Sequence, residues 1–356
     1  MVLFGGVSAE HEVSCVTAAH VLRALDPERY DLVPVAVTTE GRWVLSEDTA
    51  RALAEGSAAL PPSLATEGPS LDPLPTVGPA ATGDQVVVFP LIHGPLGEDG
   101  TVQGLLELAD VPYVGAGVLG SAVCMDKAMA KAIAGAAGLR QPRYLAARDI
   151  DVDPAFVRQV ANDLGFPVFV KPANLGSSVG ITKANDLGQL EVALATALAY
   201  DEWVLVEEAV LGREIEVAVL GNARPRASVP GEIRPSHEFY DYADKYGGHG
   251  AELLIPAPLT PEATEEVRSL ALAAYGALRC DGLGRVDFFY EEDGRGFLLN
   301  EVNTLPGFTP NSMYPALWAA SGVSYPDLVD ELVRLAVERH EHRRGHGRPQ
   351  PVVDPP

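Results

Sequence analysis

The first part of the chain combines short apolar runs with one segment of helical periodicity. Residues 2–4, 32–37 and 85–91 are apolar runs of strand length. In residues 13–25 the apolar side chains recur three and four positions apart, which predicts an amphipathic helix. Because strands that alternate with helices are typical of parallel sheets, we expect a parallel α/β unit over residues 1–122.

Proline and glycine interrupt this pattern over residues 56–84, where we expect a surface excursion or a poorly ordered loop. Regular patterning resumes in residues 123–209, which form the second expected unit. The elements predicted there are a helix over 124–137, strands over 167–171 and 179–183, a helix over 187–198 and a strand over 203–208.

A third unit is expected over residues 210–338. Its predicted elements are strands over 213–220, 284–290 and 297–303, and helices over 261–278 and 324–338. The tail, residues 339–356, is polar and rich in proline, which predicts disorder. Three histidines in this tail are interpreted as solvated rather than as metal ligands: His340, His342 and His346.

Composition narrows the partners and the compartment. The chain carries 26 Lys and Arg against 49 Asp and Glu, a formal net charge of −23, which argues against nucleic acid or an anionic membrane as main partner. Its longest apolar runs fall far short of the ~20 residues that span a bilayer. Cys15, Cys124 and Cys280 lie far apart in sequence, which excludes a disulfide framework and favours a reducing, cytoplasmic setting.

One glycine motif is weak. Gly115–Gly120 matches G-x-G-x-x-G, but the preceding strand is short and contains Pro112. The acidic residue that a dinucleotide site needs about 20 positions later is also missing from a convincing place. We therefore favour a glycine-rich link between two units over a dinucleotide site.

A stronger signal is the glycine- and serine-rich loop that follows Lys171. Lys171 ends an apolar strand, and the loop contains Gly176, Ser177, Ser178 and Gly180. Backbone N–H groups of such a loop can turn toward one anion, while the hydroxyls and the lysine add donors and charge. The alternative is a flexible hairpin with a surface lysine. A lysine in an apolar strand is uncommon without a partner, so a phosphate site is favoured.

Two further strands place acids beside an arginine. Strand alternation puts Arg285 and Asp287 on one face, and Glu301 and Asn303 on one face of the next strand. With a three-residue loop, 293–295, Asp287 lies opposite Glu301 and Arg285 opposite Asn303. Opposed carboxylates destabilise a sheet unless a cation lies between them, and oxygen ligands specify a hard cation such as Mg²⁺ or Mn²⁺. The alternative is an exposed polar sheet face.

Glu207 and Glu214 lie where the second unit passes into the third. They could accept hydrogen bonds from nucleotide amino and ribose groups, although ordinary surface glutamates explain them about as well. With the lysine loop and the acidic strands they describe a clamp, with lysines on one side of a triphosphate and metal-binding acids on the other. This arrangement resembles the ATP-grasp superfamily, whose members ligate a carboxylate to an amine through an acyl phosphate.

Further segments make the resemblance specific. They are residues 4–14 (FGGVSAEHEVS), 93–100 (HGPLGEDG), 238–246 (EFYDYADKY) and 300–312 (NEVNTLPGFTPNS). With the lysine loop, they resemble the D-alanine–D-alanine ligase family over residues 2–338. The resemblance implies an α/β, three-domain ATP-grasp architecture. It also implies ATP-dependent ligation of two D-alanines through D-alanyl phosphate, for peptidoglycan precursor synthesis.

The resemblance also assigns roles to residues. Catalytic roles are expected for Glu10, Ser177, Tyr246, Arg285 and Ser312. The D-alanine substrates would be bound by Glu10, His93, Glu98, Lys245, Tyr246, Gly307 and Ser312. ATP would be bound by Lys127, Lys171, Ser177, Ser178, Glu207, Ala209, Val210 and Glu214. Two Mg²⁺ or Mn²⁺ ions would be held by Asp287, Glu301 and Asn303.

A homodimer is a further implication of the resemblance. D-alanine–D-lactate ligases lack the lid pattern found here at residues 239–246, so an amine is favoured as the second nucleophile. The alternatives are a D-alanine–D-lactate ligase or another ATP-grasp carboxylate–amine ligase. A nucleotide-binding regulatory module without catalysis is disfavoured, because ATP binding alone does not need Arg285.

Overall fold

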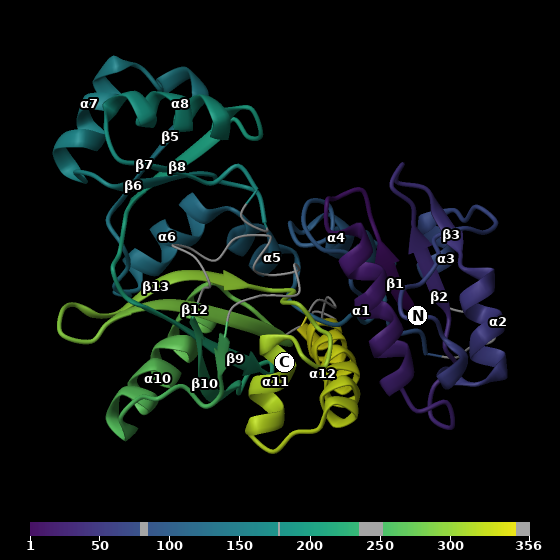
Figure 1. Ribbon diagram of the computed structural model, residues 1–356. Helices are drawn as coiled ribbons and strands as arrows, with labels where there is room; N and C mark the ends of the chain where they lie inside the picture. Colours follow the sequence, from purple (N-terminus) through teal and green to yellow (C-terminus); the bar gives the residue numbers. More distant parts are fainter. Residues whose placement is uncertain (79–84, 177–178, 235–251, 347–356) are drawn as a thin grey trace, which may run out of the picture.

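The computed structural model describes residues 1–78, 85–176, 179–234 and 252–346. The described strands form three hydrogen-bonded sheets. Figure 1 shows the N-terminal sheet on the right, the middle sheet at the upper left and the C-terminal sheet below it. The mixed α/β architecture expected from the sequence is confirmed. In the described ranges no helix is long and apolar enough to cross a membrane.

The N-terminal sheet has the strand order β3-β2-β1-β4. Its strands are β1 (Val2–Gly5), β2 (Pro34–Val37), β3 (Trp43–Leu45) and β4 (Phe89–Pro90). β1 pairs in parallel with β2 and β4, whereas β3 runs antiparallel at the edge. Helix α1 (His11–Ala24) packs against β1, and α4 (Thr101–Leu108) follows β4. The parallel core matches the prediction, but β4 is much shorter than the apolar run that predicted it.

The described part of residues 56–84 runs mostly over the surface but is anchored by buried side chains. The segment follows α2 (Glu47–Glu55) and contains the short helices η1 (Ser57–Ala59) and α3 (Pro73–Val77). Leu60, Leu64 and Val77 are buried in the cores of the N-terminal unit. The expectation of a surface excursion therefore holds for most of these residues. Prolines prevent long regular elements, while three apolar side chains between them still pack into the cores. Residues 79–84 lie outside the described residues.

The middle sheet is antiparallel, with the order β5-β8-β6-β7. Its strands are β5 (Tyr144–Arg148), β6 (Val168–Pro172), β7 (Thr182–Ala184) and β8 (Trp203–Glu208). Its helices are η2 (Asp149–Asp151), α7 (Pro154–Asp163) and α8 (Leu187–Leu198). β5 and α7 were not predicted, although Asp153 before Pro154 is a helix-start signal: its carboxylate caps the N–H groups of Ala155 and Phe156.

The C-terminal sheet is antiparallel, with the order β11-β10-β9-β12-β13. Its strands are β9 (Arg213–Leu220), β10 (Arg226–Arg234), β11 (Glu252–Leu254), β12 (Leu283–Glu291) and β13 (Gly296–Asn303). Helix α10 (Pro261–Ala277) packs on β9 and β10 through the side that buries Val267 and Ala271. β9, β12, β13 and α10 confirm the predicted elements.

The helix expected over residues 124–137 is divided. The two helices are α5 (Val118–Met125) and α6 (Lys127–Ala136). Asp126 separates them, because its carboxylate accepts the N–H of Met129 at 3.0 Å and caps α6. Ala130 and Ala134 of α6 pack in the C-terminal core, not in the middle one. The boundary drawn after residue 122 therefore falls inside α5, and the helices that open the second unit in sequence pack on the third.

The C-terminal helices join the first and third units into one core. They are α11 (Met313–Ala320) and α12 (Tyr325–His346). Phe4, Trp318 and Leu332 belong to the same buried apolar cluster. Figure 1 shows α12 between α11 and α1, and α1 packs against it. The N-terminal unit therefore has a fixed position relative to the C-terminal sheet.

The tail expected to be disordered from residue 339 continues α12 instead. Arg339 is 6 % exposed, donates hydrogen bonds to the carbonyl oxygens of Tyr113 and Gly115, and lies over the Tyr113 ring at 4.1 Å. Further ion pairs along the helix join Arg343 to Glu107 and Arg344 to Asp110, and Nε2 of His340 lies 3.5 Å from Oδ1 of Asp110. The polar composition of this segment wrongly predicted disorder, because its arginines have partners in the N-terminal unit. Residues 347–356 lie outside the described residues.

The segment Gly115–Gly120 links the N-terminal unit to α5. A Cβ at Gly120 would lie 2.7 Å from the carbonyl oxygen of Arg279. Glycine is therefore needed there for close backbone packing, which supports a link rather than a dinucleotide site.

Replacing Arg339 tests how the two units are joined. We expect Arg339→Met to lower the free energy of unfolding by about 2–4 kcal/mol, because two buried carbonyl oxygens lose a charged donor. Arg334→Met, on the exposed side of the same helix, removes pairs with Glu331 and Glu338 and should cost less than about 1 kcal/mol. Urea unfolding followed by tryptophan fluorescence measures both, and equal effects would contradict the buried anchor.

Candidate active site

A cavity of about 710 Å³ lies between the N-terminal unit, the middle sheet and the C-terminal sheet. It is lined by 14 of the predicted residues: Glu10, His93, Glu98, Lys127, Lys171, Glu207, Val210, Glu214, Arg285, Asp287, Glu301, Asn303, Gly307 and Ser312. Ala209 is not among the lining residues, and its N–H donates to the carbonyl oxygen of Pro167. Four predicted residues lie outside the described residues: Ser177, Ser178, Lys245 and Tyr246.

At the middle-sheet end of the cavity, Glu207 lies between two lysines. Its Oε1 is 2.5 Å from Nζ of Lys131, and its Oε2 pairs with Nζ of Lys171. Glu207 comes from β8, Lys171 from the neighbouring strand β6 and Lys131 from α6. Lys131 and Glu207 are buried, and the Lys171 side chain is 13% exposed. The partner that a lysine in an apolar strand requires is therefore Glu207.

Charge and burial compete in this triad. Burial raises the pKa of the Glu207 carboxyl, but the two lysines outweigh burial and lower this pKa to about 2. Burial lowers the pKa of Lys171, yet Glu207 outweighs it and the pKa is raised. For Lys131 burial is the larger effect and lowers the pKa, although Glu207 opposes it. The carboxylate thus stays ionised over the whole neutral range and accepts hydrogen bonds only.

The glycine loop connects this end of the cavity to the N-terminal unit. Nζ of Lys127, in the first turn of α6, donates to the carbonyl oxygen of Leu175 at 2.5 Å. A Cβ at Gly176 would lie 3.7 Å from Oε2 of Glu10. The loop backbone therefore lies between the lysines and the N-terminal substrate loop, where a phosphate chain could be held.

The N-terminal loops supply a second ion pair. Nδ1 of His93 is 3.5 Å from Oε1 of Glu98, and the same carboxylate accepts the N–H of Gly94 at 2.7 Å. Ser8 ties the two loops together by donating to the carbonyl oxygen of His93 at 2.7 Å. Burial lowers the pKa of His93, but its hydrogen bond to Glu98 and the nearby carboxylates raise it overall. His93 therefore stays cationic to a higher pH than a free histidine, as the binding of an anion requires.

The hairpin of β12 and β13 has the predicted pairs at the site. Arg285 lies opposite Asn303 and Asp287 opposite Glu301. The turn, however, has four residues, 292–295, because Glu291 pairs with Gly296. An irregularity after Asp287 shifts the register by one residue and restores the predicted pairs.

Arg285 is fixed by two carboxylates. Its Nε and Nη2 donate to Oδ1 and Oδ2 of Asp287 at 2.8 and 2.7 Å, and its Nε is 2.9 Å from Oε2 of Glu216. Burial lowers the pKa of Arg285, but Asp287 and Glu216 outweigh it and raise the pKa well above its ordinary value. A rigid guanidinium in a buried setting can stabilise negative charge that develops on a substrate.

Another part of the cavity wall is formed where the start of helix α11 lies beside Gly307. Ser312 is the N-cap of α11, and its Oγ accepts the N–H of Thr309 at 3.1 Å. A Cβ at Gly307 would lie 3.3 Å from Oγ of Ser312. The hydroxyl and the free N–H groups of the first helical turn form a site for a carboxylate.

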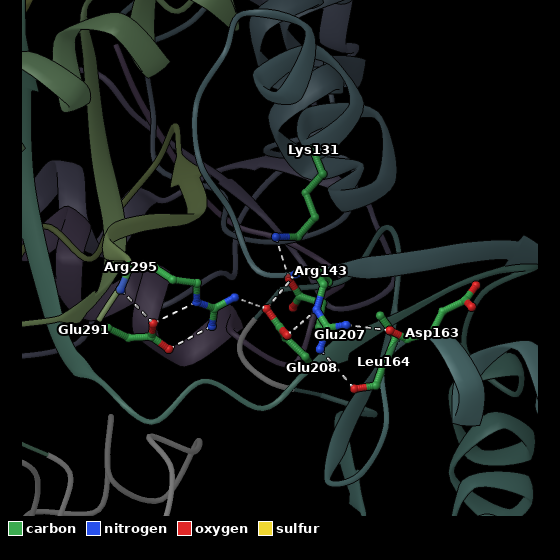
Figure 2. Close-up of polar contacts among 8 residues, drawn as sticks. All are labelled: Lys131, Arg143, Asp163, Leu164, Glu207, Glu208, Glu291 and Arg295. Atoms are coloured by element: carbon green, nitrogen blue, oxygen red, sulfur yellow. Dashed lines mark hydrogen bonds and ion pairs between the residues drawn. The ribbon is translucent and has the colours of Figure 1, made fainter. Parts of the chain in front are cut away.

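The neighbouring glutamate on β8, Glu208, also lines the cavity but makes a different network. Figure 2 shows Glu208 held by Arg143 and by Arg295, and Arg295 is also bound to Glu291. Arg143 in turn donates to the carbonyl oxygens of Asp163 and Leu164. Because Arg295 belongs to the β12–β13 turn, this network joins the middle sheet to the C-terminal sheet.

The proposed metal ligands fit a hard cation by donor type. Asp287, Glu301 and Asn303 offer only oxygen atoms to one cavity. Both oxygens of Asp287 accept from Arg285, and Oδ1 of Asn303 accepts the N–H of Leu305 at 2.9 Å. Among the described residues, no group of three His, Cys, Asp or Glu side chains is arranged as a metal site.

Comparison with known proteins decides the family. The model described as D-ala D-ala ligase N-terminus matches residues 1–116, and the model described as D-ala D-ala ligase C-terminus matches residues 133–334. The chain belongs to the D-alanine–D-alanine ligase family. The family resemblance drawn from the sequence motifs is thereby confirmed.

Individual relatives extend over nearly the whole chain. The D-alanine–D-alanine ligase of Geobacillus kaustophilus (strain HTA426) is 48% identical over 351 residues, 96% of this chain and 95% of that protein. The one from Arthrobacter sp. (strain FB24) is 49% identical over 358 residues, 95% of this chain and 94% of that protein.

Two solved structures share the fold. The D-alanine–D-alanine ligase from Coxiella burnetii has a TM-score of 0.78 and 34% identity, covering 97% of this chain and 95% of that one. The VanG D-Ala:D-Ser ligase from Enterococcus faecalis has a TM-score of 0.81 and 34% identity, covering 94% and 98%. This family member is therefore an ATP-grasp enzyme of the ligase class, as expected from the sequence.

Two buried charges near the site were missed by sequence reasoning. Lys131 lies four residues after Lys127 on α6, so both are on one helix face. Glu216 lies two residues after Glu214 on β9, so both are on one strand face, opposite Asp287. Spacing alone could have pointed to both, but it could not tell a buried face from a solvated one.

The depressed pKa of Glu207 predicts a pH-dependent loss of stability in this ligase. Its carboxyl titrates near 2 when folded and near 4.5 when unfolded, so its stabilisation is full above about pH 5 and lost as pH falls toward 2. At neutral pH the contribution is roughly 3 kcal/mol.

We expect Glu207→Gln to be less stable than the native chain at pH 7, and the difference to shrink between pH 5 and pH 3. Urea unfolding across this range measures it. Glu55→Gln, at an exposed position of α2, is the control and should stay close to the native chain. A difference for Glu207→Gln that is constant with pH would contradict the charged triad.

Proposed function

We propose that this chain ligates two D-alanines to D-alanyl-D-alanine at the expense of ATP, for peptidoglycan precursor synthesis in the cytoplasm. One observation carries the proposal. One cavity is lined by Lys127 and Lys171, by Arg285 and the carboxylates of its hairpin, and by Glu10 and His93 of the N-terminal loops, which supports a site that brings these groups to the same substrates. The family's name and the sequence motifs support the choice of substrates.

The first step activates a carboxylate. Glu10 holds the ammonium of the first D-alanine, and His93, kept cationic by Glu98, faces its carboxylate. The carboxylate oxygen attacks the γ-phosphorus of ATP, the bond to the β-bridging oxygen breaks, and ADP leaves. Lys127 and Lys171 neutralise the phosphates during the transfer.

The second step forms the amide. The free amine of the second D-alanine attacks the carbonyl carbon of D-alanyl phosphate, loses a proton and expels phosphate. Arg285 and the backbone N–H at Gly307 stabilise the oxyanion of the tetrahedral intermediate. Ser312, at the start of α11, binds the carboxylate of the second D-alanine.

Nucleotide and metal complete the proposal. Glu207, Val210 and Glu214, which line the cavity, bind the adenosine part of ATP, whereas Ala209, which was expected to join them, does not line it. Asp287, Glu301 and Asn303 hold two Mg²⁺ or Mn²⁺ ions, which when bound offset the charge of the triphosphate. The family resemblance also makes a homodimer the expected assembly, which light scattering would test.

The choice of second nucleophile rests on the lid residues. Ser177, Ser178, Lys245 and Tyr246 are proposed to close over the substrates and to exclude water that would hydrolyse the acyl phosphate. The tyrosine-rich lid pattern favours an amine over a hydroxyl. The structural likeness to a D-Ala:D-Ser ligase makes D-serine the competing second substrate to compare.

Phosphate release from ATP with Mg²⁺ tests the function. We expect release with D-alanine alone, second order in D-alanine, and none with L-alanine. Adding D-lactate or D-serine to limiting D-alanine should change little. Release that requires D-lactate would replace the proposal by depsipeptide formation, and a preference for D-serine would replace the second substrate. Absence of release with every substrate would contradict the ligase mechanism.

Arg285 is the residue whose loss should affect chemistry most. We expect Arg285→Met to lower kcat by about 10²–10³-fold, because a positioned charge at the oxyanion is lost. Arg148→Met, which removes an exposed pair with Glu202 on the middle sheet, is the matched control and should keep kcat within about twofold. Equal kcat values for both variants would remove Arg285 from the mechanism.

A further inference from the structure

Lys131 is a buried charge that the proposed reaction does not use. Its side chain is 4 % exposed, on a helix otherwise made of Lys127, small residues, Met129 and Ile133. Figure 2 shows Lys131 reaching from its helix to the carboxylate of Glu207. Its Nζ also donates to the carbonyl oxygen of Asn300 at 3.4 Å. Burying an ammonium is costly, so its retention here calls for a reason beyond packing.

The two lysines that share Glu207 have different surroundings. Lys171 lines the cavity and pairs with Oε2 of Glu207, whereas Lys131 approaches Oε1 from α6 and is not among the residues that line the cavity. An anionic ligand entering the cavity therefore meets Lys171 directly. Lys131 stays behind the carboxylate, with the glutamate between it and the ligand.

This difference matters when a phosphate arrives. A phosphate group competes with Glu207 for the ammonium of Lys171. If Lys171 turned toward the phosphate and no other cation were present, Glu207 would be a buried carboxylate without its counterion, which is strongly unfavourable. The carboxyl would then hold Lys171 back or take up a proton, and in either case ATP would bind less well. Lys131 removes this conflict because it pairs with the other oxygen.

We propose that Lys131 is a positioning residue for ATP: it keeps the Glu207 carboxylate charged and in place at the adenosine end, so that Lys171 is available to the phosphates. The inference deepens the proposed function and rests on it. Lys131 itself touches neither nucleotide nor D-alanine. Its effect should therefore appear in ATP binding and should depend on Glu207.

The charges around Lys131 limit the choice of variant. Glu207 and Lys171 are its nearest charged neighbours, and Glu301 on β13 adds an attraction. Lys131→Met keeps the length of the side chain and removes the charge, whereas Lys131→Arg keeps the charge. Arg143→Met is the matched control, because Arg143 binds the adjacent glutamate, Glu208, on the other side of the same strand (Figure 2).

The experiment compares these variants in two assays. Steady-state phosphate release gives kcat and the KM values for ATP and for D-alanine. Calorimetry with a non-hydrolysable ATP analogue and Mg²⁺ gives nucleotide affinity without turnover. For Lys131→Met we expect KM for ATP and the Kd of the analogue to rise about tenfold or more. This is the size of effect that coupling energies between contacting residues produce. KM for D-alanine should stay within about twofold, and Lys131→Arg should restore most of the affinity.

A double-mutant cycle separates positioning from general packing. In the Glu207→Gln background, Lys131→Met should change the affinity for the analogue by less than about threefold, because the carboxylate through which it acts is gone. Arg143→Met should leave both KM values near those of the native chain. Thermal unfolding of every variant checks that the protein is folded.

Several results would overturn the inference. These are an unchanged analogue affinity in folded Lys131→Met, an equal loss in both backgrounds, or a matching loss in Arg143→Met. If Lys131→Met does not fold, Lys131→Arg becomes the test. Weak ATP binding by a folded Lys131→Arg variant, which keeps the charge, would also contradict the inference. Failure of the proposed function looks different: the native chain would bind the analogue but release no phosphate with D-alanine.

Discussion

One buried carboxylate shared by two lysines holds the middle-sheet end of the cavity together. Glu207 belongs to β8 of the middle sheet, Lys171 to β6 beside it, and Lys131 to α6, whose apolar face packs in the C-terminal core. The triad therefore joins the two parts of the clamp as well as arranging charge inside it. The next residue of β8, Glu208, repeats this link through its pair with Arg295 in the β12–β13 turn (Figure 2). Buried opposite charges support such a junction only when every member is paired, which is why loss of one partner should be costly.

The other half of the cavity depends on a hydrophobic junction rather than on charge. Phe4 of β1 and Trp318 of α11 share one core, and α12 is anchored to the N-terminal unit through Arg339. The loops that carry Glu10 and His93, which line the cavity, are thus fixed relative to Arg285. A reaction in which an acyl phosphate forms and is then attacked by an amine, with loss of phosphate, needs such fixed distances, because small displacements of reacting groups slow the chemistry strongly.

At the β12–β13 hairpin the residue pairs predicted from the sequence are correct, although the loop length used to predict them is not. The sequence indicated that Asp287 faces Glu301, on the basis of a three-residue loop. The structure has a four-residue turn and an irregularity that shifts the register by one residue, so the same pairs result. The irregularity leaves Asn300 unpaired in the ladder, and its carbonyl oxygen accepts from Lys131. The extra residue in the turn is compensated by the irregularity after Asp287, so both arrangements give the same pairs at the site. Only the folded hairpin shows which arrangement is present.

Sequence by itself determined the elements with strong periodicity and the residues with distinctive chemistry. β8, β9, α8 and the pairing of Asp287 with Glu301 follow from local pattern, since alternation and turn signals act over a few residues. Tertiary structure alone decided the rest. It placed α6 on the C-terminal core, ordered α12 as far as His346 through partners in the N-terminal unit, and buried Lys131 and Glu216 beside the site. Lys131, α6 and α12 each depend on partners more than 70 residues away in sequence, and Glu216 depends on Arg285 of the neighbouring strand. Local periodicity carries no information about such partners.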